Sequence, residues 1–219
     1  MKTLVIVQEN MLEEAKKSLW HKFNPDYESY LTGNEKQYDL IVDLSTEEAP
    51  IQITRYFHLK EKLVVVASVC RTLLESVAET SLEPECFLFG CNALPYFLSR
   101  PVLELTAYET DEQHYLAATL SKNEIPFYFV ADQVGMVTPR VICKIINEAF
   151  FMLQEGSASE EDIDLSMKLG TNYPYGPFEW AEIIGIKNVY TVLEAMQHTF
   201  KSDQFKIAPL LHQLYLRQL

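Results

Sequence analysis

Residues Leu63-Val64-Val65-Val66-Ala67 form an uninterrupted run of aliphatic side chains. A strand with one exposed face would alternate with polar residues, so this run indicates a strand that is covered on both faces. Five other β-rich runs predict strands at 4–7, 40–44, 87–89, 102–106 and 127–130. Helical patterns between strands lie at 11–19, 47–61, 72–80 and 111–123. This alternation predicts a parallel α/β sheet.

The second part of the chain shows helical periodicity and no convincing strand pattern. One apolar stripe at helical spacing consists of Val141, Ile145, Ala149 and Met152. The next helix is expected to begin at the cap pair Ser159 and Asp162 and to end at Gly170. Further helices are expected at 178–184, 189–200 and 207–216. We therefore predict two domains, 1–132 and 133–219.

Composition and charge exclude several classes of protein. The chain has 219 residues, of which 48% are hydrophobic and 22% are charged, as in folded globular proteins. Its 18 basic and 31 acidic residues give a net charge of −13, which disfavours nucleic acid and anionic membranes as partners. No apolar run approaches the roughly 18 residues of a membrane-spanning helix, and the short run at 4–7 does not resemble a signal peptide. We expect a cytoplasmic protein.

The cysteine and histidine residues do not form a recognisable metal site. The four cysteines lack a CxxC pair and clustered histidines, so a zinc site is not predicted. Buried free thiols are favoured over a disulfide, which stays open as an alternative. The five histidines are interpreted as surface or packing residues. They are His21, His58, His114, His198 and His212.

A series of fragments between residues 132 and 186 carries a family resemblance. The fragments are Asp132-Gln133-Val134-Gly135-Met136-Val137-Thr138-Pro139-Arg140, Asn147-Glu148-Ala149, Glu155-Gly156, Asp162-Ile163-Asp164 and Tyr173-Pro174-Tyr175-Gly176-Pro177-Phe178-Glu179. In this order they are similar to the C-terminal domain of the 3-hydroxyacyl-CoA dehydrogenase family, and the number of fragments makes the match specific. The resemblance implies a truncated Rossmann-like domain with a parallel sheet. It further implies an all-α domain of the 6-phosphogluconate-dehydrogenase-C-like type.

The resemblance also implies a catalytic site, from which this chain departs. Gly90-Cys91-Asn92 followed by Glu104 resembles the family segment in which a His is the general base and a Glu, twelve positions later, orients it. Asn92 stands at the His position and cannot accept a proton near neutral pH, whereas Glu104 is kept. The substrate-contacting Asn of the family corresponds to Pro139, and the substrate-contacting Ser to Arg71. Thr72 replaces that Ser if the register shifts by one residue.

The family's cofactor is NAD, but the motif that binds it is absent. Dinucleotide binding requires glycines after the first strand, where the backbone approaches the pyrophosphate. Here that turn reads Gln8-Glu9-Asn10 and contains no glycine. The interval between Val7 and Leu40 is also too short for the family's full ribose-binding strand and the helices that follow it. We therefore predict that the chain binds no cofactor.

Alternative interpretations stay open for several of these residues. Glu104 is also explained as a surface carboxylate at a strand end, and 173–177 as a rigid helix connection rather than a ligand loop. For the whole protein, one hypothesis is an inactive family member that binds an acyl-CoA-like ligand or a protein partner. The second is a working oxidoreductase of fatty acid metabolism that converts 3-hydroxyacyl-CoA to 3-oxoacyl-CoA. The third is a structural dimer without a ligand.

The resemblance implies a homodimer that forms through residues beyond 138. The helical domain contains more large apolar residues than a domain of its size needs for its own core. The residues assigned to this surplus are Phe150, Phe151, Met152, Trp180, Ile183 and Ile184. Symmetric dimers are the commonest protein oligomers, which favours the same expectation.

Overall fold

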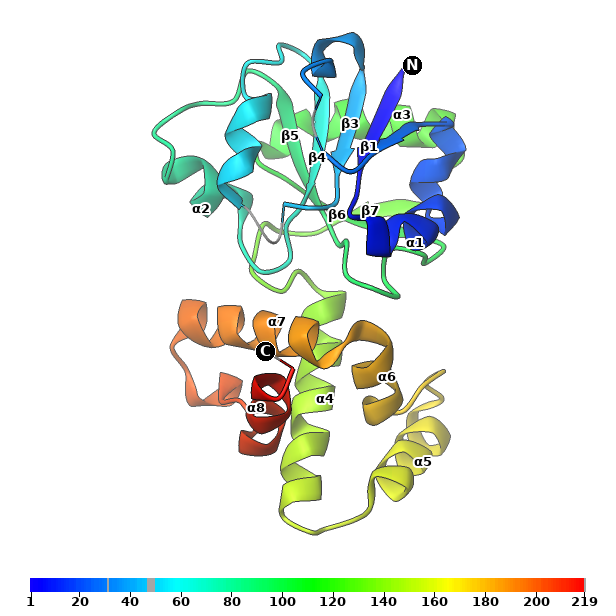
Figure 1. The fold of residues 1–219 in the computed structure, drawn as a ribbon, viewed down its shortest axis with the longest axis vertical. Coiled ribbons are helices and arrows are strands. Elements are labelled where there is room, and N and C mark those ends of the chain that lie inside the picture. Colours follow the sequence, from blue (N-terminus) through cyan, green and yellow to red (C-terminus); the bar gives the residue numbers. More distant parts are fainter. Residues whose placement is uncertain (31, 47–49, 219) are drawn as a thin grey trace. The chain divides into compact units, whose positions relative to one another are not determined.

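The computed structural model describes residues 1–30, 32–46 and 50–218. They form two compact units, Met1–Met136 and Val137–Leu219, which are drawn in Figure 1. The first unit is built on a mixed sheet and the second consists of helices. This is the predicted fold class, and the division falls a few residues beyond the predicted boundary at 132.

The sheet of the first unit has seven strands in the order β2-β1-β3-β4-β5-β6-β7. The strands are β1 (Thr3–Ile6), β2 (Asp26–Glu28), β3 (Leu40–Asp43), β4 (Leu63–Ala67), β5 (Phe87–Cys91), β6 (Leu103–Ala107) and β7 (Phe127–Phe129). All six predicted strands are present within a few residues of their expected bounds.

Two features of the sheet differ from the prediction. Strand β2 pairs with β1 in parallel, and its polar sequence Asp26-Tyr27-Glu28 gave no apolar signal because it forms the edge of the sheet. The sheet is also not wholly parallel, since β6 runs antiparallel to β5. The short connection 92–102 consists of turns and bends, and parallel strands need a longer crossover. Strand β6 therefore runs in the opposite direction to β5.

The strand order shows how the first unit is shortened. The usual dinucleotide-binding order is 3-2-1-4-5-6, in which a third strand lies outside the second. Here β2 is the edge strand, and the next strand along the chain, β3, lies on the other side of β1. The strand that would lie outside β2 is therefore missing. The order nevertheless reverses at β1, which has β2 on one side and β3 on the other. In open α/β sheets, ligands bind at the carboxyl ends of the strands beside such a reversal.

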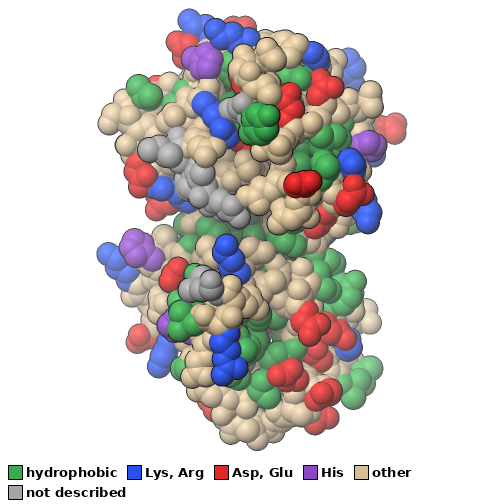
Figure 2. Space-filling view, viewed as in Figure 1, with side chains coloured by type: hydrophobic (Ala, Val, Ile, Leu, Met, Phe, Trp, Pro, Cys, Tyr) green, Lys and Arg blue, Asp and Glu red, His purple; other side chains and the backbone are tan. Residues whose placement is uncertain are grey.

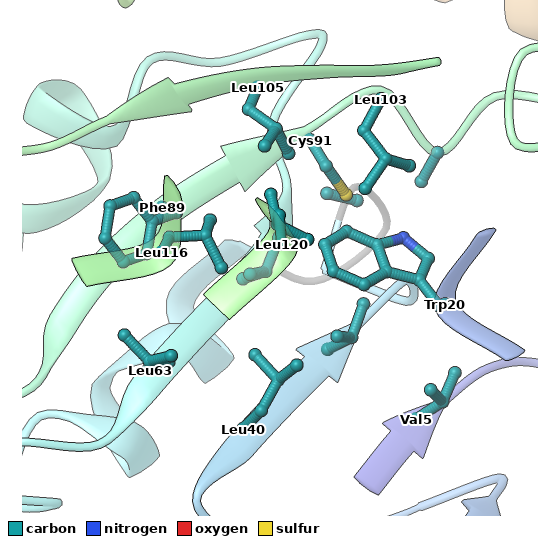
Figure 3. Packing of buried hydrophobic residues seen from close by; sticks show 14 of the residues in the cluster. Val5, Trp20, Leu40, Leu63, Phe89, Cys91, Leu103, Leu105, Leu116 and Leu120 are labelled. Atoms are coloured by element: carbon teal, nitrogen blue, oxygen red, sulfur yellow. The ribbon is translucent and has the colours of Figure 1, made fainter. Parts of the chain in front are cut away.

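Apolar side chains cover both faces of the central strands, as the uninterrupted run at 63–67 predicts. On one face, Val65 and Phe89 belong to a cluster that includes Trp20 and residues of α3 (Gln113–Lys122), as Figure 3 shows. On the other face, Val64 and Val66 pack with residues of α2 (Leu73–Ala78). The first predicted helix contains α1 (Leu12–Lys17).

The helix predicted at 47–61 is only partly observed. Residues 47–49 lie outside the described residues, and 50–56 form a 3-10 helix rather than an α-helix. Tyr56, at the end of that helix, is completely buried in the second cluster. The segment therefore packs onto the sheet without forming a regular amphipathic helix.

Helix α4 is central to the second unit and packs against three other helices, α6, α7 and α8. The helices of the unit are α4 (Thr138–Gln154), α5 (Glu160–Thr171), α6 (Pro177–Ile184), α7 (Ile186–Phe200) and α8 (Pro209–Leu216). Ser159 caps α5, because its Oγ accepts a hydrogen bond from the Asp162 N–H at 3.2 Å, as predicted. The end of α5 was predicted wrongly: the helix continues through Gly170, and Asn172 ends it in the left-handed conformation.

The apolar stripe predicted on α4 was also wrong in part. Val141 and Met152 are 47% and 41% exposed, whereas Ile142, Ile146 and Phe150 are buried. These buried residues recur every four positions and face the neighbouring helices. Both faces of α4 carry apolar residues, so the periodicity alone did not identify the buried one.

Several residues assigned to a dimer surface are buried in the single chain. They are Phe150, Trp180 and Ile184, which are between 1% and 4% exposed. Met152 and Ile183 do stay exposed, at 41% and 39%. No described helix is long and apolar enough to cross a membrane.

The four cysteines are free thiols, as predicted. Cys86, Cys91 and Cys143 are buried, and Cys70 is half-buried. Burial raises the pKa values of Cys86 and Cys143 to about 12, so both thiols stay protonated at neutral pH. Within the described ranges, no group of three or more potential ligands could hold a metal ion.

Candidate functional site

Asn92 and Glu104 form a buried pair where the end of β5 meets the beginning of β6. Antiparallel pairing places them together, and the Asn92 backbone N–H donates to the Glu104 carbonyl oxygen at 3.2 Å. The Asn92 Nδ2 donates to Glu104 Oε2 at 3.3 Å. The two residues are only 7% and 5% exposed, so the surface interpretation of Glu104 was wrong. The predicted contact between these two positions is therefore present.

The side-chain oxygen of Asn92 is also engaged. Its Oδ1 accepts a hydrogen bond from the Leu94 N–H at 3.3 Å. The amide thus accepts through its oxygen and donates through its nitrogen, and neither atom titrates near neutral pH. The Asn92 amide thus holds the Glu104 side chain in one orientation. The amide itself cannot take up a proton.

Gly90 allows strand β5 to approach its neighbours closely. A Cβ atom at this position would lie 2.6 Å from Thr106 Cγ2 and 2.8 Å from Ser68 Cβ. Any side chain would push β5 away from β6 and from the segment that follows β4. The glycine of the Gly90-Cys91-Asn92 motif is therefore required by packing beside the candidate site.

Arg71 and Thr72 make contacts that stabilise helix α2. The Arg71 guanidinium forms an ion pair with Glu79 at the end of α2. Thr72 is the N-cap of α2: its Oγ1 accepts from the Glu75 N–H at 3.0 Å, and the Glu75 carboxylate accepts from the Thr72 N–H at 3.1 Å. The segment after β4 is thus ordered by a capping box at the start of α2.

Asp132 binds the same helix terminus from a distant part of the chain. Its two carboxylate oxygens accept from the Leu73 and Leu74 N–H groups, each at 3.0 Å. Burial raises the pKa of Asp132, while these two N–H groups act in the opposite direction. Three residues later, the Gly135 N–H donates to the Val69 carbonyl at 2.6 Å. The beginning of the family-like motif therefore holds the segment that follows β4.

The motif residues of the second unit also have structural contacts. Asp164 is 8% exposed and accepts from the N–H groups of Phe178 and Glu179 at the start of α6, at 2.8 and 3.1 Å. Glu179 accepts from the Gly176 N–H at 2.8 Å and from Lys168 Nζ at 2.6 Å. Residues 173–177 are therefore a tightly bonded helix connection, as one of the two interpretations predicts.

We expect Gly176→Ala to lower the free energy of unfolding by about 1–3 kcal/mol, because of overpacking. A Cβ atom on Gly176 would clash with Asp164 Cγ, which is fixed by its bonds to α6. Urea denaturation of the whole chain measures the change.

The matched control is Gly170→Ala, inside helix α5. Nothing lies within 4 Å of a Cβ at Gly170, so this change is expected to stabilise the protein by about 0.5–1 kcal/mol. Equal effects of the two substitutions would contradict the assignment of Gly176 to close packing against Asp164.

Pro139 and Arg140 lie in the first turn of α4. Pro139 is buried, and a proline is well accommodated there because the first-turn N–H groups have no partner within the helix. Its ring offers no hydrogen-bond donor to a ligand. The Arg140 guanidinium lies over the Phe200 ring, 4.7 Å from its centre. The Asn-Arg pair of the family is thus represented by one residue without a donor and one packed against an aromatic ring.

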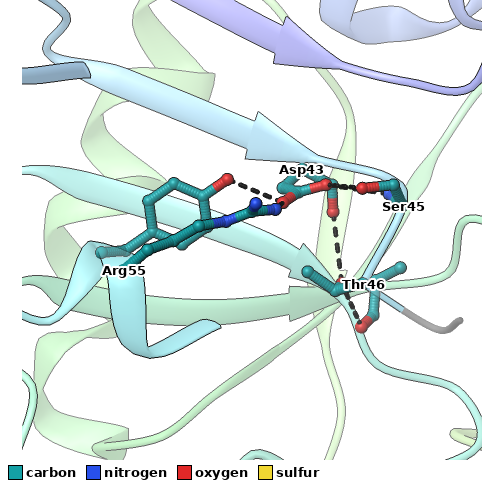
Figure 4. A network of polar contacts seen from close by, with 6 residues as sticks. Asp43, Ser45, Thr46 and Arg55 are labelled. Carbon is teal, nitrogen blue, oxygen red and sulfur yellow. Dashed lines mark hydrogen bonds and ion pairs between the residues drawn. The ribbon is translucent and has the colours of Figure 1, made fainter. Parts of the chain in front are cut away.

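Asp43 is the centre of a buried polar network that the sequence analysis did not find. It ends β3, beside the strand reversal, and its side chain is fully buried. Figure 4 shows its carboxylate accepting hydrogen bonds from Ser45 and Arg55, and the Tyr56 hydroxyl donates to the same carboxylate. The distances are 2.6 Å from Ser45 Oγ, 2.8 Å from Arg55 Nη2 and 2.7 Å from the Tyr56 hydroxyl. The only sequence signal was an aspartate within a strongly apolar run.

Comparison with known proteins places these features in a family. Residues 135–218 match the model of the 3-hydroxyacyl-CoA dehydrogenase C-terminal domain. Over 96% of its length, the chain is 26% identical to 3-hydroxybutyryl-CoA dehydrogenase of Clostridioides difficile, of which it covers 79%. The helical unit thus matches the C-terminal domain of the 3-hydroxyacyl-CoA dehydrogenase family, and the whole chain is similar to a dehydrogenase of this family.

Two further comparisons show how the similarity is distributed. The chain is 44% identical to 3-hydroxyadipyl-CoA dehydrogenase of Escherichia coli over 84 residues, which are 38% of this chain and 18% of that protein. The chain thus spans less than a fifth of that relative. The crystal structure of (S)-3-hydroxybutyryl-CoA dehydrogenase PaaH1 from Ralstonia eutropha covers 100% of this chain and 94% of its own, with a TM-score of 0.78 and 20% identity. At this identity the comparison shows the fold.

The turn after β1 does not fit the dinucleotide that the 3-hydroxyacyl-CoA dehydrogenase family uses. Residues Glu9–Met11 form a 3-10 turn, and α1 after it has only six residues. Glu9 is exposed in the first turn, where its carboxylate would repel a pyrophosphate. Gln8, Glu9 and Asn10 all carry side chains where glycines would let the backbone approach the phosphates.

Glu28 is an acidic residue beside the turn after β1 that the sequence analysis did not consider. Glu28 ends β2, twenty residues after Gln8, and β2 lies beside β1. An acidic residue at this spacing binds the ribose hydroxyls in dinucleotide-binding folds. Strand β2 has only three residues, and among the described residues only a 3-10 helix at Glu35–Gln37 lies between it and β3, so the interval between Val7 and Leu40 is short, as expected. A ribose position without a phosphate-binding turn still does not fit the whole dinucleotide.

Proposed function

We propose that this chain is a 3-hydroxyacyl-CoA dehydrogenase-like protein that does not catalyse the dehydrogenase reaction and binds an acyl-CoA-like ligand. The observation that carries the proposal is the Asn92–Glu104 pair, a buried carboxylate bonded to an amide that cannot accept a proton. Oxidation of a 3-hydroxyl requires removal of the hydroxyl proton as hydride leaves carbon. Without a base, that step loses its proton acceptor.

The β1 turn supports the same conclusion from the cofactor side. The Glu9 carboxylate and the missing glycines disfavour the pyrophosphate of NAD. An enzyme of this class needs a hydride acceptor, and the phosphates supply much of the cofactor's binding. Loss of the base and loss of the phosphate site are independent defects, which favours an inactive protein over a modified enzyme.

The preserved surroundings of the pair support a binding role. Gly90, the capped start of α2 and Asp132 keep the segment after β4 ordered against β5. Relatives of this chain are named for 3-hydroxybutyryl-CoA and 3-hydroxyadipyl-CoA, which indicates the chemical class of the ligand. We further propose that the protein acts in the cytoplasm in connection with fatty acid metabolism.

A calorimetric titration tests this proposal. We expect saturable binding of 3-hydroxybutyryl-CoA or acetoacetyl-CoA, and no saturable binding of NAD at micromolar concentrations. The ligand should also raise the melting temperature, because ligand at about 100 times its Kd stabilises a protein by about 2.7 kcal/mol. Free coenzyme A is the control that isolates the acyl group. Saturable NAD binding, or no binding of either thioester, would contradict the proposal.

A working oxidoreductase is the second candidate, and Glu28 favours it. This residue stands where an acid would bind the cofactor's ribose, so part of the dinucleotide site survives in β2. In that case Glu104 would act as the base after Asn92 moved aside. The NADH-formation assay described in the Discussion separates this candidate from the inactive one.

We also propose that the chain forms a homodimer through its helical unit. Leu165 and Leu169 on α5 are 52% and 77% exposed, and Met152 and Ile183 are exposed as well. Leu165 and Leu169 are one helical turn apart, so they lie on the same side of α5. Exposed apolar side chains of this kind are typical of an interface, and a symmetric dimer is the commonest way to cover them.

Light scattering at tens of micromolar, an approximate concentration suited to stable interfaces, is expected to give about twice the 25.3 kDa chain mass. Combined Leu165→Glu and Leu169→Glu substitutions should give the monomer mass. Leu82→Glu is the matched control, because Leu82 is equally apolar and 55% exposed but belongs to the α/β unit. A monomeric unmodified protein would refute the dimer.

A further inference from the structure

Asn92 lies at the edge of the sheet where the parallel strands end. Strands β1, β3, β4 and β5 run in the same direction, and Asn92 is the first residue after β5. Ser68 follows β4, and its N–H donates to the Cys91 carbonyl at 3.2 Å, so the ends of these two strands lie side by side. Ligands of open α/β sheets bind outside the carboxyl ends of the strands. Asn92 is therefore placed on the ligand-binding edge of the sheet.

The orientation of the Asn92 amide is fixed by its two partners. Its Oδ1 accepts from the Leu94 N–H and its Nδ2 donates to Glu104 Oε2, each at 3.3 Å. Turning the amide over would place Nδ2 against an N–H donor and Oδ1 against a carboxylate oxygen, and both contacts would be repulsive. The amide therefore holds one orientation, in which the backbone engages its oxygen.

One of the two N–H donors of this amide is not used by the protein. Glu104 takes one of them. Among the residues that the structure describes, no second acceptor bonds to Asn92 Nδ2. Asn92 is only 7% exposed, so little water reaches it. A buried donor without an acceptor is costly, and a ligand oxygen that accepts from it therefore gains affinity.

The directions of the two N–H bonds decide which ligand oxygen is accepted. They point roughly 120° apart, so two acceptors about 3 Å from the nitrogen lie about 5 Å from each other. A carbonyl oxygen accepts from Asn92 and needs no further partner. A hydroxyl oxygen also accepts, but its own proton then needs an acceptor about 3 Å away. Glu104 Oε2 is too distant for that proton, and Asn92 Oδ1 is held by Leu94.

The charge of Glu104 further requires an uncharged ligand oxygen. A ligand carboxylate on the second N–H would lie about 5 Å from the Glu104 carboxylate, since both would bind to one nitrogen. Glu104 is only 5% exposed, so water screens this repulsion poorly. The acidic side chains that Figure 2 shows on the surface of each unit are, in contrast, screened by water and salt. A neutral carbonyl group is the acceptor that fits.

We propose that Asn92 makes this site selective for a 3-oxoacyl thioester over the corresponding 3-hydroxyacyl thioester, by donating its second N–H to the ketone oxygen. The inference rests on the proposed binding of an acyl-CoA-like ligand and goes beyond it, because it names the oxidation state of that ligand. The ketone satisfies the buried donor. The hydroxyl brings a proton for which the Asn92–Glu104 pair has no acceptor in reach.

Calorimetric titration of the whole chain with acetoacetyl-CoA, (S)-3-hydroxybutyryl-CoA and butyryl-CoA tests the selectivity. We expect acetoacetyl-CoA to bind about tenfold more tightly than either of the others, because each of them leaves a buried polar group without a partner. In Asn92→Asp, an oxygen replaces the Nδ2 donor and shares a proton with Glu104, since two adjoining carboxylates do not both ionise readily. The ligand then meets an acceptor, so 3-hydroxybutyryl-CoA should become the tighter ligand.

Asn123→Asp is the matched control for this substitution. Asn123 is half-buried in the same unit, and its Nδ2 donates to the Thr119 carbonyl at 2.9 Å at the end of α3. The chemical change is thus the same, but it lies outside the Asn92–Glu104 pair. We expect the preference for acetoacetyl-CoA to persist in Asn123→Asp.

The outcomes separate this inference from the proposed function. Equal affinities for the three thioesters would overturn the selectivity and leave the proposed binding function intact. Absence of binding for all three would overturn both. A preference for the ketone that persists in Asn92→Asp would show that another group causes it, which also overturns the inference. Circular dichroism melting curves confirm that each variant is folded.

Discussion

The unmodified protein is expected to form no NADH from 3-hydroxybutyryl-CoA and NAD, even at high protein concentration. A positioned base contributes about a hundred- to ten-thousand-fold to such a reaction, and the Asn92 amide cannot supply it. A second stabilising contact, of about 3 kcal/mol by analogy with an oxyanion donor, is missing at Pro139. In addition, the turn after β1 disfavours binding of the pyrophosphate of NAD.

Combining Asn92→His with Pro139→Asn is expected to leave the protein inactive. Histidine at position 92 would be placed to bond to Glu104, because the strand pairing already brings these positions together. The cofactor defect would remain, since neither substitution changes the turn at Glu9. NADH absorbance measures turnover, and NAD titration of the same variant shows whether cofactor binding is the remaining obstacle.

The matched variant for this assay is Glu104→Gln. It keeps the size of the side chain and a hydrogen-bond acceptor for Asn92 Nδ2, but removes the carboxylate charge. Turnover by the unmodified protein that disappears in Glu104→Gln would contradict the inactive interpretation. It would instead identify Glu104 as a substitute base.

Asp43→Ala is expected to lower the free energy of unfolding by about 3–5 kcal/mol, the cost of breaking a buried ion pair. The substitution leaves the Arg55 guanidinium and the buried Tyr56 hydroxyl without their shared acceptor. Burial, followed by the Asp43 charge, raises the pKa of Tyr56, so the phenol stays neutral and keeps its need for an acceptor. Arg55 is 28% exposed and partly regains water, which favours the lower end of the range. Urea denaturation, with the m-value checked for constancy, measures the loss.

A surface ion pair is the control for this effect. Lys60 and Glu85 approach to 3.6 Å but are 74% and 52% exposed, so Glu85→Ala is expected to change stability by at most about 1 kcal/mol. Asp43→Asn should give an intermediate loss, because the amide keeps one acceptor oxygen. A loss below about 1 kcal/mol in Asp43→Ala would refute the role of Asp43 in fixing the end of β3.

Local sequence patterns predicted the elements whose environment is uniform. The run Leu63–Ala67 is covered on both faces, so every residue had to be apolar and the pattern was unambiguous. Edge strand β2 has one neighbour and polar side chains, so no local signal distinguished it from a loop. The buried face of α4 was misjudged for the opposite reason, since Val141 and Ile142 are both apolar and only contacts with other helices decide between them.

The residues of the candidate site were likewise predicted only in part. The family resemblance placed Asn92 and Pro139 at the positions of a His and an Asn, and their side-chain chemistry then predicted that the corresponding groups are missing. The contact of Asn92 with Glu104 was predicted through the family segment, whereas the network around Asp43 was not predicted at all. Its partners Arg55 and Tyr56 lie twelve and thirteen residues away and follow no helical or strand spacing.

By itself, the sequence of this protein predicted the fold class and the two-domain organisation, and it shows an Asn at position 92 and no glycine in the turn after the first strand. These depend on side-chain type and on short-range periodicity. Only the tertiary structure decided the reversal of β6, the position of Glu28 at the end of a strand beside β1 and the structural roles of Asp132, Asp164 and Gly176. Each of these depends on which distant backbone groups meet. Such meetings are set by the packing of the whole chain, because hydrogen-bond partners far apart in sequence leave no local pattern.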